Sequence, residues 1–178
     1  MDTDAIRIVE YAPQWRAEFA RLNLEWLEAH FVVEPIDRTV LLDPETHIID
    51  PGGRILFALD GKDRVVGTVA LKREGEDVYE LTKMAVDPAC RGHGIGRQLM
   101  LASLAAFRQL GGHELFLESS SKLAPALRLY ESVGFEHRSA PRPGSHYQRA
   151  DIYMVWKPAS QLRGTRDRPA RRQDSSHR

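Results

Sequence analysis

The chain has 178 residues, which fits one domain of ordinary size and excludes two full ones. With 42% hydrophobic and 28% charged residues it can form a core and stay in solution, which excludes a fibrous or wholly disordered protein. Basic and acidic residues balance at 25 each, yet from residue 157 onward basic residues exceed acidic ones by five. Residues 160–178 are almost free of apolar side chains, so we expect one domain over residues 1–158 and a basic, disordered tail over 159–178.

The sequence favours a cytoplasmic protein without a membrane partner. Its one cysteine, Cys90, cannot form an intramolecular disulfide. The first residues lack a basic segment followed by an apolar run, and no stretch reaches the ~18 apolar residues needed to cross a bilayer.

The first part of the chain predicts a strand followed by helices. Residues 6–9 alternate between apolar and polar, as in a short strand. A helix begins at Pro13, and its apolar residues recur every three or four positions, which predicts one buried face: Trp15, Phe19, Leu22, Trp26 and Ala29. Between Pro35 and Pro44 we expect a short helix over residues 39–42.

Three β-rich runs follow, over residues 54–60, 64–72 and 78–86. The loops between them, 61–63 and 74–77, are too short for a crossover. We therefore expect three consecutive antiparallel strands.

The second half alternates between helices and strands. The patterns predict helices over 94–110 and 124–133 and strands over 114–118, 135–138 and 151–156. This order of elements is typical of a mixed α/β sheet covered by helices.

The most informative segment runs from the strand ending at residue 86 into the helix after Gly94. Gly92, Gly94 and Gly96 let the backbone approach a ligand closely. A helix begins there, so its N–H groups can bind phosphate oxygens, and Arg91 and Arg97 add positive charge. The segment lacks the Gly-Lys-Ser/Thr of a P-loop and the glycine spacing of a Rossmann fold.

Two motifs carry a family resemblance. The sequence RGHGIG at residues 91–96 resembles the acyl-coenzyme A signature R/Q-x-x-G-x-G/A of the GNAT superfamily of N-acetyltransferases. The sequence ALRLYESVGF at residues 126–135 is similar to the family segment A-x-x-L-Y-E-x-x-G-F. The resemblance implies an α/β fold with a mixed, mostly antiparallel sheet, helices on both faces and a splayed central cleft.

The resemblance also implies a cosubstrate, acetyl-CoA, and positions that bind it. The backbone near residues 84–86 would pair with the pantetheine arm, and the N–H groups of residues 91–97 would hold the pyrophosphate. The residues expected to bind the cosubstrate are Met84, Ala85, Val86, Arg91, Gly92, His93, Gly94, Ile95, Gly96 and Arg97.

Two residues are expected to act in catalysis. Tyr130 matches the family tyrosine whose hydroxyl reaches the coenzyme A sulfur, and the alternative is an aromatic residue packed in the core. Glu80 lies on the strand leading to Met84, where several members of the family carry a carboxylate that takes the proton of the amine through water, and the alternative is an ordinary solvated residue. Tyr79 and Glu118 are further candidates for the base. Many relatives carry asparagine where this chain has Leu123, so a polar replacement would come from residues 119–122.

The acceptor is expected to be a small amine or an amino acid. Glu34 could hold its ammonium group and Arg149 its carboxylate. In the alternative interpretation, Glu34 caps a turn and Arg149 pairs with Asp151.

The sequence therefore predicts an acetyltransferase that moves an acetyl group from acetyl-CoA to a primary amine by direct attack. Alternatives are a protein N-terminal or lysine acetyltransferase, or a non-catalytic module that binds coenzyme A or nucleic acid; the last is disfavoured because the tail lacks interleaved aromatic residues. The histidines show no metal-ligand spacing, so we expect no metal. We expect a monomer or a homodimer.

Overall fold

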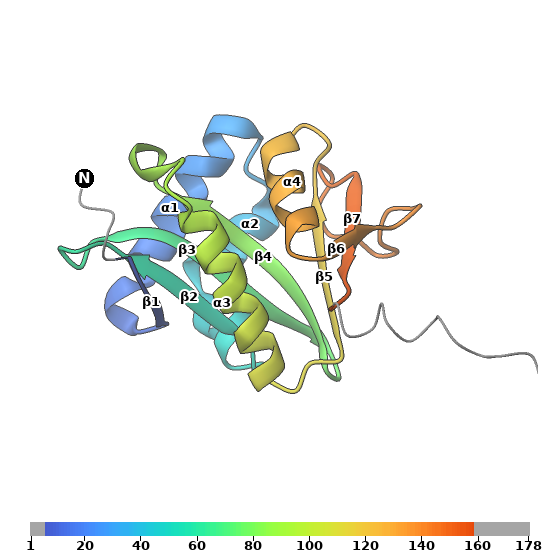
Figure 1. Ribbon diagram of the computed structural model, residues 1–178, viewed down its shortest axis with the longest axis horizontal. Coiled ribbons are helices and arrows are strands. Elements are labelled where there is room, and N and C mark those ends of the chain that lie inside the picture. Colours follow the sequence, from blue (N-terminus) through green and yellow to red (C-terminus); the bar gives the residue numbers. More distant parts are fainter. Residues whose placement is uncertain (1–5, 159–178) are drawn as a thin grey trace, which may run out of the picture.

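A computed structural model describes residues 6–158 of the chain, so the predicted tail lies outside the described residues. A seven-stranded sheet with the order β1-β2-β3-β4-β5-β7-β6 forms the middle layer of the described part (Figure 1). Its strands are β1 (Arg7–Glu10), β2 (Arg54–Leu59), β3 (Val65–Gly75), β4 (Val78–Val86), β5 (Glu114–Ser119), β6 (Phe135–His137) and β7 (Ile152–Trp156). Neighbouring strands are antiparallel except β4 and β5, which are parallel. The predicted mixed, mostly antiparallel sheet is thus confirmed.

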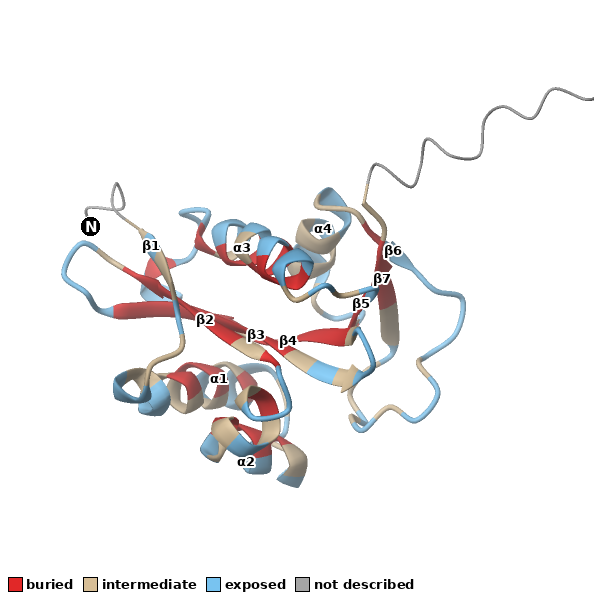
Figure 2. Ribbon diagram, turned by 90° about the horizontal axis from the view of Figure 1, so that it is seen from below, coloured by how far each residue is buried: buried red, intermediate tan, exposed pale blue. Residues whose placement is uncertain are grey.

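Helices cover both faces of the sheet, as Figure 2 shows. One face carries α1 (Arg16–His30) and α2 (Pro35–Leu42), and the other carries α3 (Ile95–Gln109) and α4 (Ala124–Ser132). Each face has its own cluster of buried apolar side chains. Short helical turns lie at Pro13–Trp15, Glu45–Ile49 and Pro88–Cys90. Over residues 6–158, none of the helices combines the length and apolarity needed to cross a bilayer.

Two details of the first helices differ from the sequence prediction. α2 begins at Pro35 rather than at residue 39, because Glu34 and Asp37 form a capping box and proline suits the first helical turn. Ala29, predicted on the buried face of α1, is exposed, since the buried residues of α1 end at Leu27.

The sheet opens between β4 and β5. These strands pair only from Val78 to Glu80 on β4, against Glu114 to Phe116 on β5. β4 then continues to Val86 without β5 beside it, while β5 pairs with β7 on its other side. The predicted splayed cleft is therefore present.

A β-bulge in β4 decides which side chains face this cleft. Thr68 of β3 pairs with Ala85 and Ala70 pairs with Thr82, so two β4 residues, Lys83 and Met84, lie opposite one β3 residue. Lys83 takes a φ of 53°, the left-handed region that side chains rarely adopt. Because the bulge interrupts the alternation of the strand, neighbouring residues Thr82 and Lys83 both line one pocket.

Candidate active site

A groove of about 320 Å³ runs along the free end of β4 to the start of α3 and to α4. Most residues predicted to bind the cosubstrate line it. They are Met84, Ala85, Val86, Arg91, Gly92, Gly94, Ile95 and Gly96. Trp26 from α1 and Pro125, Ala126, Leu129 and Tyr130 from α4 line it as well.

The turn before α3 leaves room for a ligand above its backbone. Gly92 and Gly94 have φ values of 79° and 76°, and a Cβ atom added at either position would meet nothing within 4 Å. Gly94 is the N-cap of α3, and no side chain caps the first turn of that helix. An uncapped helix start facing open space fits an anionic group such as a diphosphate.

Two residues predicted in this site direct their side chains elsewhere. The His93 ring lies 3.2 Å from the Cys90 carbonyl, and the Arg97 guanidinium donates to the Ser132 hydroxyl at 3.1 Å. Neither His93 nor Arg97 lines the groove within the described residues.

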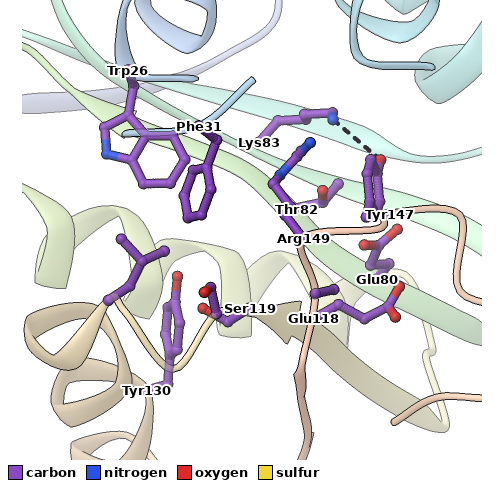
Figure 3. A pocket seen from close by; sticks show the side chains of 13 residues that line it. Trp26, Phe31, Glu80, Thr82, Lys83, Glu118, Ser119, Tyr130, Tyr147 and Arg149 are labelled. Carbon is purple, nitrogen blue, oxygen red and sulfur yellow. Dashed lines mark hydrogen bonds between the residues drawn. The ribbon is translucent and has the colours of Figure 1, made fainter. Parts of the chain in front are cut away.

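A second, smaller pocket of about 100 Å³ lies on the other side of Tyr130 (Figure 3). Strands, helices and the loop before β7 all contribute to it. Its lining residues are Trp26, Phe31, Glu80, Thr82, Lys83, Glu118, Ser119, Ser120, Leu123, Tyr130, Tyr147, Arg149 and Ala150.

Tyr130 and Trp26 line both the groove and the pocket, so the two cavities meet at these side chains. The Tyr130 ring packs edge-on against Phe135, with ring centroids 6.2 Å apart. Burial raises the pKa of Tyr130 to about 12, so its hydroxyl stays protonated at neutral pH. Trp26, interpreted from the sequence as a core residue, packs against the buried cluster under α1 and also lines both cavities.

Glu80 is buried under the pocket. Its side chain is 4% exposed and, within residues 6–158, makes no hydrogen bond, although it lines the cavity. Burial first, and then the negative charges of Glu74 and Glu118, raise the pKa of Glu80 to about 7, against the opposing charge of Lys83.

The two alternative bases differ in their placement. Glu118 lines the same pocket as Glu80. Tyr79 packs edge-on against Phe107 in the core beneath α3, on the other face of the sheet. The prediction of Tyr79 as a base is therefore wrong, because successive residues of a strand point to opposite faces.

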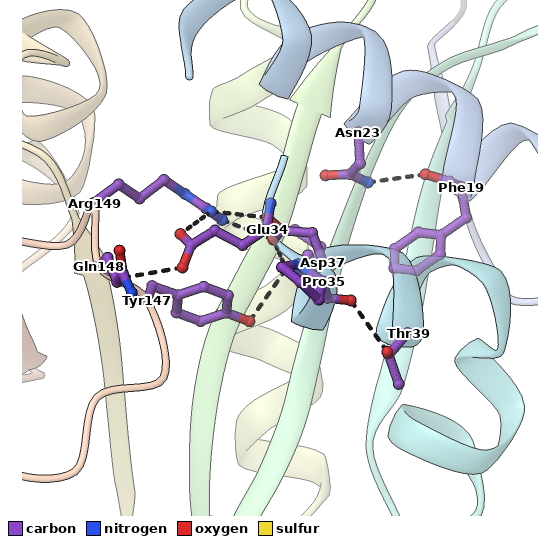
Figure 4. Close-up of polar contacts among 10 residues, drawn as sticks. Phe19, Asn23, Glu34, Pro35, Asp37, Thr39, Tyr147, Gln148 and Arg149 are labelled. Carbon is purple, nitrogen blue, oxygen red and sulfur yellow. Dashed lines mark hydrogen bonds and ion pairs between the residues drawn. The ribbon is translucent and has the colours of Figure 1, made fainter. Parts of the chain in front are cut away.

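An ion network holds one wall of the pocket (Figure 4). Asp37, which is fully buried, accepts two hydrogen bonds from the Arg149 guanidinium at 2.8 Å and one from the Lys83 ammonium at 2.9 Å. Arg149 also donates to Glu34 at 2.7 Å, and Lys83 donates to the Tyr147 hydroxyl at 3.1 Å. Two cations and two carboxylates thus neutralise each other.

The pKa values of this network follow from the same contacts. Burial alone would raise the pKa of Asp37, but the hydrogen bonds from Arg149 and the charge of Lys83 outweigh it and lower the value. Burial lowers the pKa of Lys83, and the carboxylate of Asp37 opposes that shift. Burial also opposes the charge of Arg149, yet its contacts with Asp37 raise its pKa.

This network changes the interpretation of Glu34 and Arg149. Within the described residues Glu34 does not line the pocket. Its carboxylate accepts hydrogen bonds from the Arg149 guanidinium and from the Gln148 backbone N–H. Arg149 lines the pocket, but Glu34 and Asp37 occupy its guanidinium. Arg149 does not pair with Asp151, which binds Ser121 at 2.5 Å. Glu34 and Arg149, both predicted to bind the acceptor, therefore form an ion pair with each other.

Sequence reasoning missed several residues of the pocket. Lys83 directly follows Thr82, so two polar residues in succession break the alternation of the strand, and that irregularity was the available signal. Asp37 and Tyr147 carried no local signal, since their partners are remote in sequence. At the position of Leu123, which lines the pocket, the nearby polar groups in the lining are Ser119 and Ser120.

Comparison with known proteins places this site in a family context. The sequence model of the acetyltransferase (GNAT) family matches residues 10–135. A mycothiol acetyltransferase from Actinosynnema mirum is 36% identical over 85 residues, which cover 48% of this chain and 29% of that protein. The uncharacterized N-acetyltransferase YjgM from Escherichia coli is 32% identical over 99 residues, covering 54% of this chain and 59% of that protein. The chain thus matches less than two thirds of the length of these relatives.

Solved structures share the fold. An acetyltransferase of the GNAT family from Staphylococcus aureus superposes with a TM-score of 0.77 at 22% identity, covering 85% of this chain and 98% of that one. The PaiA N-acetyltransferase from Thermoplasma acidophilum, solved in complex with coenzyme A, gives a TM-score of 0.66 at 19% identity, covering 86% and 99%. At these identities the likeness concerns the fold.

Proposed function

Because the chain belongs to the acetyltransferase (GNAT) family, we propose that it transfers an acetyl group from acetyl-CoA to the primary amine of a small molecule by direct attack. The observation that carries the proposal is the position of Tyr130 at the junction of two cavities. One cavity ends at an uncapped, glycine-rich helix start, and the other ends at a buried carboxylate. A thioester in the groove and an amine in the pocket would meet beside this phenol.

Glu80 would remove the proton of the acceptor, directly or through water. An ordinary alkylammonium has a pKa of about 10.4, whereas an ordinary glutamate lies near 4.3. Raising the pKa of Glu80 to about 7 narrows that gap and strengthens the carboxylate as a base. Burial thus gives Glu80 a basicity suited to neutral pH.

Tyr130 would stabilise the sulfur of the leaving group. Acetyl-CoA, when bound, supplies a thioester carbonyl for the amine and a thiolate that departs. A thiol has a pKa of about 8.5, below the value of about 12 for Tyr130. The phenol therefore keeps its proton and donates a hydrogen bond to the sulfur, which stabilises the negative charge that develops there.

The Glu80→Gln variant should lose about 100-fold in kcat, because glutamine cannot accept the proton. In the wild-type protein, kcat/KM should rise with pH through about 7 as Glu80 ionises. The variant should lack that rise. A pH series of thiol release with saturating acetyl-CoA measures both, and an unchanged pH profile in the variant would assign the base to another group.

The same substitution should stabilise the fold at alkaline pH. The pKa of Glu80 is raised in the folded state, so ionisation destabilises the protein as pH rises from 4.5 to about 7. The gain of Glu80→Gln in unfolding free energy should therefore appear over that interval and reach about 3 kcal/mol above it. Denaturant unfolding of both proteins at pH 4 and pH 8 measures this gain. If Glu80 were solvated, the gain would be the same at both pH values.

The Gly96→Ala variant tests the groove. Its added Cβ would lie 3.5 Å from Leu129 Cδ2, an ordinary contact, so the helix should fold normally. The methyl group would enter the groove lining, and we expect the Kd for coenzyme A to rise about tenfold, or about 1.4 kcal/mol. Calorimetry measures this. The matched control is Gly75→Ala at the end of β3, which adds a methyl group outside the groove and should leave the Kd unchanged.

The proposal as a whole is tested by screening amines with acetyl-CoA while free thiol is followed. We expect acetylated small amines as products. Acetylation confined to peptide N-termini or protein lysines would replace the small-molecule acceptor, and no heat with coenzyme A in calorimetry would refute the acyl-transfer function.

A further inference from the structure

The pocket opposite the groove has an excess of negative charge. Its two cationic lining residues, Lys83 and Arg149, are already neutralised by Asp37 and Glu34. The other carboxyl groups in the lining are those of Glu80 and Glu118. Neither forms an ion pair or a hydrogen bond within residues 6–158, so the charge that the pocket offers a ligand is negative.

The sheet brings these two carboxylates together. Glu80 of β4 pairs in register with Phe116 of β5, and Glu118 follows two residues later on the same face of β5. Both line the cavity, and the charge of Glu118 contributes to raising the pKa of Glu80. Figure 3 shows both side chains on the same side of the pocket. Arg142 stacks over the Phe116 ring at 4.0 Å and forms no ion pair with either carboxylate.

The uncharged lining also favours a cation. Trp26 and Phe31 form an aromatic wall, with ring centroids 5.8 Å apart. The faces of aromatic rings attract organic cations, and the Arg149 guanidinium already lies 5.9 Å from the Phe31 centroid while the His30 ring stacks on Trp26. Glu80, nine-tenths buried and without a hydrogen-bond partner in the described chain, points into the same cavity and forms no ion pair within residues 6–158, although the charges of Lys83 and Lys72 act on it from a greater distance.

We propose that the acceptor carries a second positive charge besides the reacting amine, as a diamine does, and that Glu118 determines this specificity by binding the remote ammonium. This inference rests on the proposed acetyl transfer. Glu80 accepts the proton of the reacting nitrogen, and the carboxylate of Glu118 binds the ammonium group at the other end of the acceptor. An amino acid is disfavoured, because its carboxylate would face Glu80 and Glu118 and would find Arg149 already bound to Asp37.

A matched series of acceptors tests this inference. The compounds 1,4-diaminobutane, n-butylamine and 4-aminobutanoate share a four-carbon chain and differ in the charge of the group remote from the reacting amine. With the full chain and saturating acetyl-CoA, we expect kcat/KM for the diamine, halved for its two reactive ends, to exceed that for butylamine about tenfold. The value for aminobutanoate should be lower than that for butylamine.

The Glu118→Gln variant should lower the ratio between diamine and butylamine about tenfold, mainly through KM. Glu76→Gln, an exposed residue of the β3–β4 turn outside the pocket lining, removes the same charge and should keep the ratio. Equal wild-type rates for diamine and butylamine would overturn the inference. A Glu118→Gln variant that slows both amines alike would also overturn it, because Glu118 would then act on the reacting nitrogen.

Binding separates this inference from the proposed function. Calorimetry with 1,4-diaminobutane, in the presence of coenzyme A, should give a Kd that rises about tenfold in Glu118→Gln. Diamine binding that depends on Glu118, without thiol release from any amine, would support the cation site and refute the acyl transfer. Turnover of monoamines without diamine preference would leave the transfer standing and refute the cation site.

Discussion

The Tyr130→Phe variant should lose about 100- to 1000-fold in kcat while its Kd for coenzyme A changes less than about twofold. Removing one hydrogen-bond donor from a developing negative charge has an effect of this size. The substitution removes only the hydroxyl, and the ring keeps its contact with Phe135. The groove contacts of the turn before α3 are untouched, so binding of coenzyme A should persist. Single-turnover thiol release and calorimetry measure the two quantities.

Tyr79→Phe is the matched control for this experiment. Tyr79 lies in the core on the opposite face of β4, so loss of its hydroxyl should leave kcat within about twofold of the wild-type value. A Tyr130→Phe variant with wild-type kcat would remove the phenol from the reaction. A variant with normal kcat and weakened coenzyme A binding would make Tyr130 a binding residue of the groove.

The Asp37→Ala variant should lose about 3–5 kcal/mol of unfolding free energy. Breaking a buried ion pair leaves its partner charged and unpaired, and here both Lys83 and Arg149 lose the carboxylate. The Lys83 side chain is 5% exposed, so water cannot replace Asp37 without rearrangement. Urea denaturation at pH 7 measures the loss.

The pH dependence of this contribution follows from the lowered pKa of Asp37. Its stabilisation is fully present above the unfolded value of 3.8 and is lost as pH falls through the lower folded value. The difference between wild type and Asp37→Ala should therefore keep its full size between pH 5 and pH 7 and shrink in acid.

Glu10→Ala serves as the surface control for Asp37→Ala. Its carboxylate pairs with Arg54 at 3.0 Å in an exposed position, and such pairs contribute about 1 kcal/mol or less. A loss below about 1 kcal/mol in Asp37→Ala would show that the buried network does not stabilise the fold. If Asp37→Ala does not fold, Asp37→Asn replaces it, because asparagine keeps the shape of the side chain and some of its hydrogen bonds. Its loss of unfolding free energy should lie between those of Glu10→Ala and Asp37→Ala.

The order of strands and helices could be predicted because each depends on local patterns. Residues 54–59 and 65–75 form neighbouring antiparallel strands because a short loop joins two β-rich runs. Gly94 at the start of α3 and Gly111 after its end mark that helix through conformations available mainly to glycine. The early start of α2 was missed because its capping box involves the acidic residues Glu34 and Asp37 rather than serine or threonine.

The β4 bulge shows where local patterns fail. A regular strand would place Thr82 and Lys83 on opposite faces, yet both line the pocket. The extra residue is visible only in the pairing with β3, where Thr68 meets Ala85 and Ala70 meets Thr82. Register between strands is a property of the assembled sheet, so the sequence pattern of β4 alone could not supply it.

The sequence by itself determined the glycine-rich turn, the helix that follows it and the tyrosine of α4, because neighbouring residues set backbone conformation and helical periodicity. The tertiary structure decided the charge of the pocket beside Tyr130. From the sequence, Arg149 was predicted to bind a carboxylate of the acceptor. In the fold it binds Asp37, which lies 112 positions away in the sequence. Within the described residues Glu80 and Glu118 form no ion pair, and the sequence could not show this either. Ion pairing depends on distance in space and not on separation along the chain.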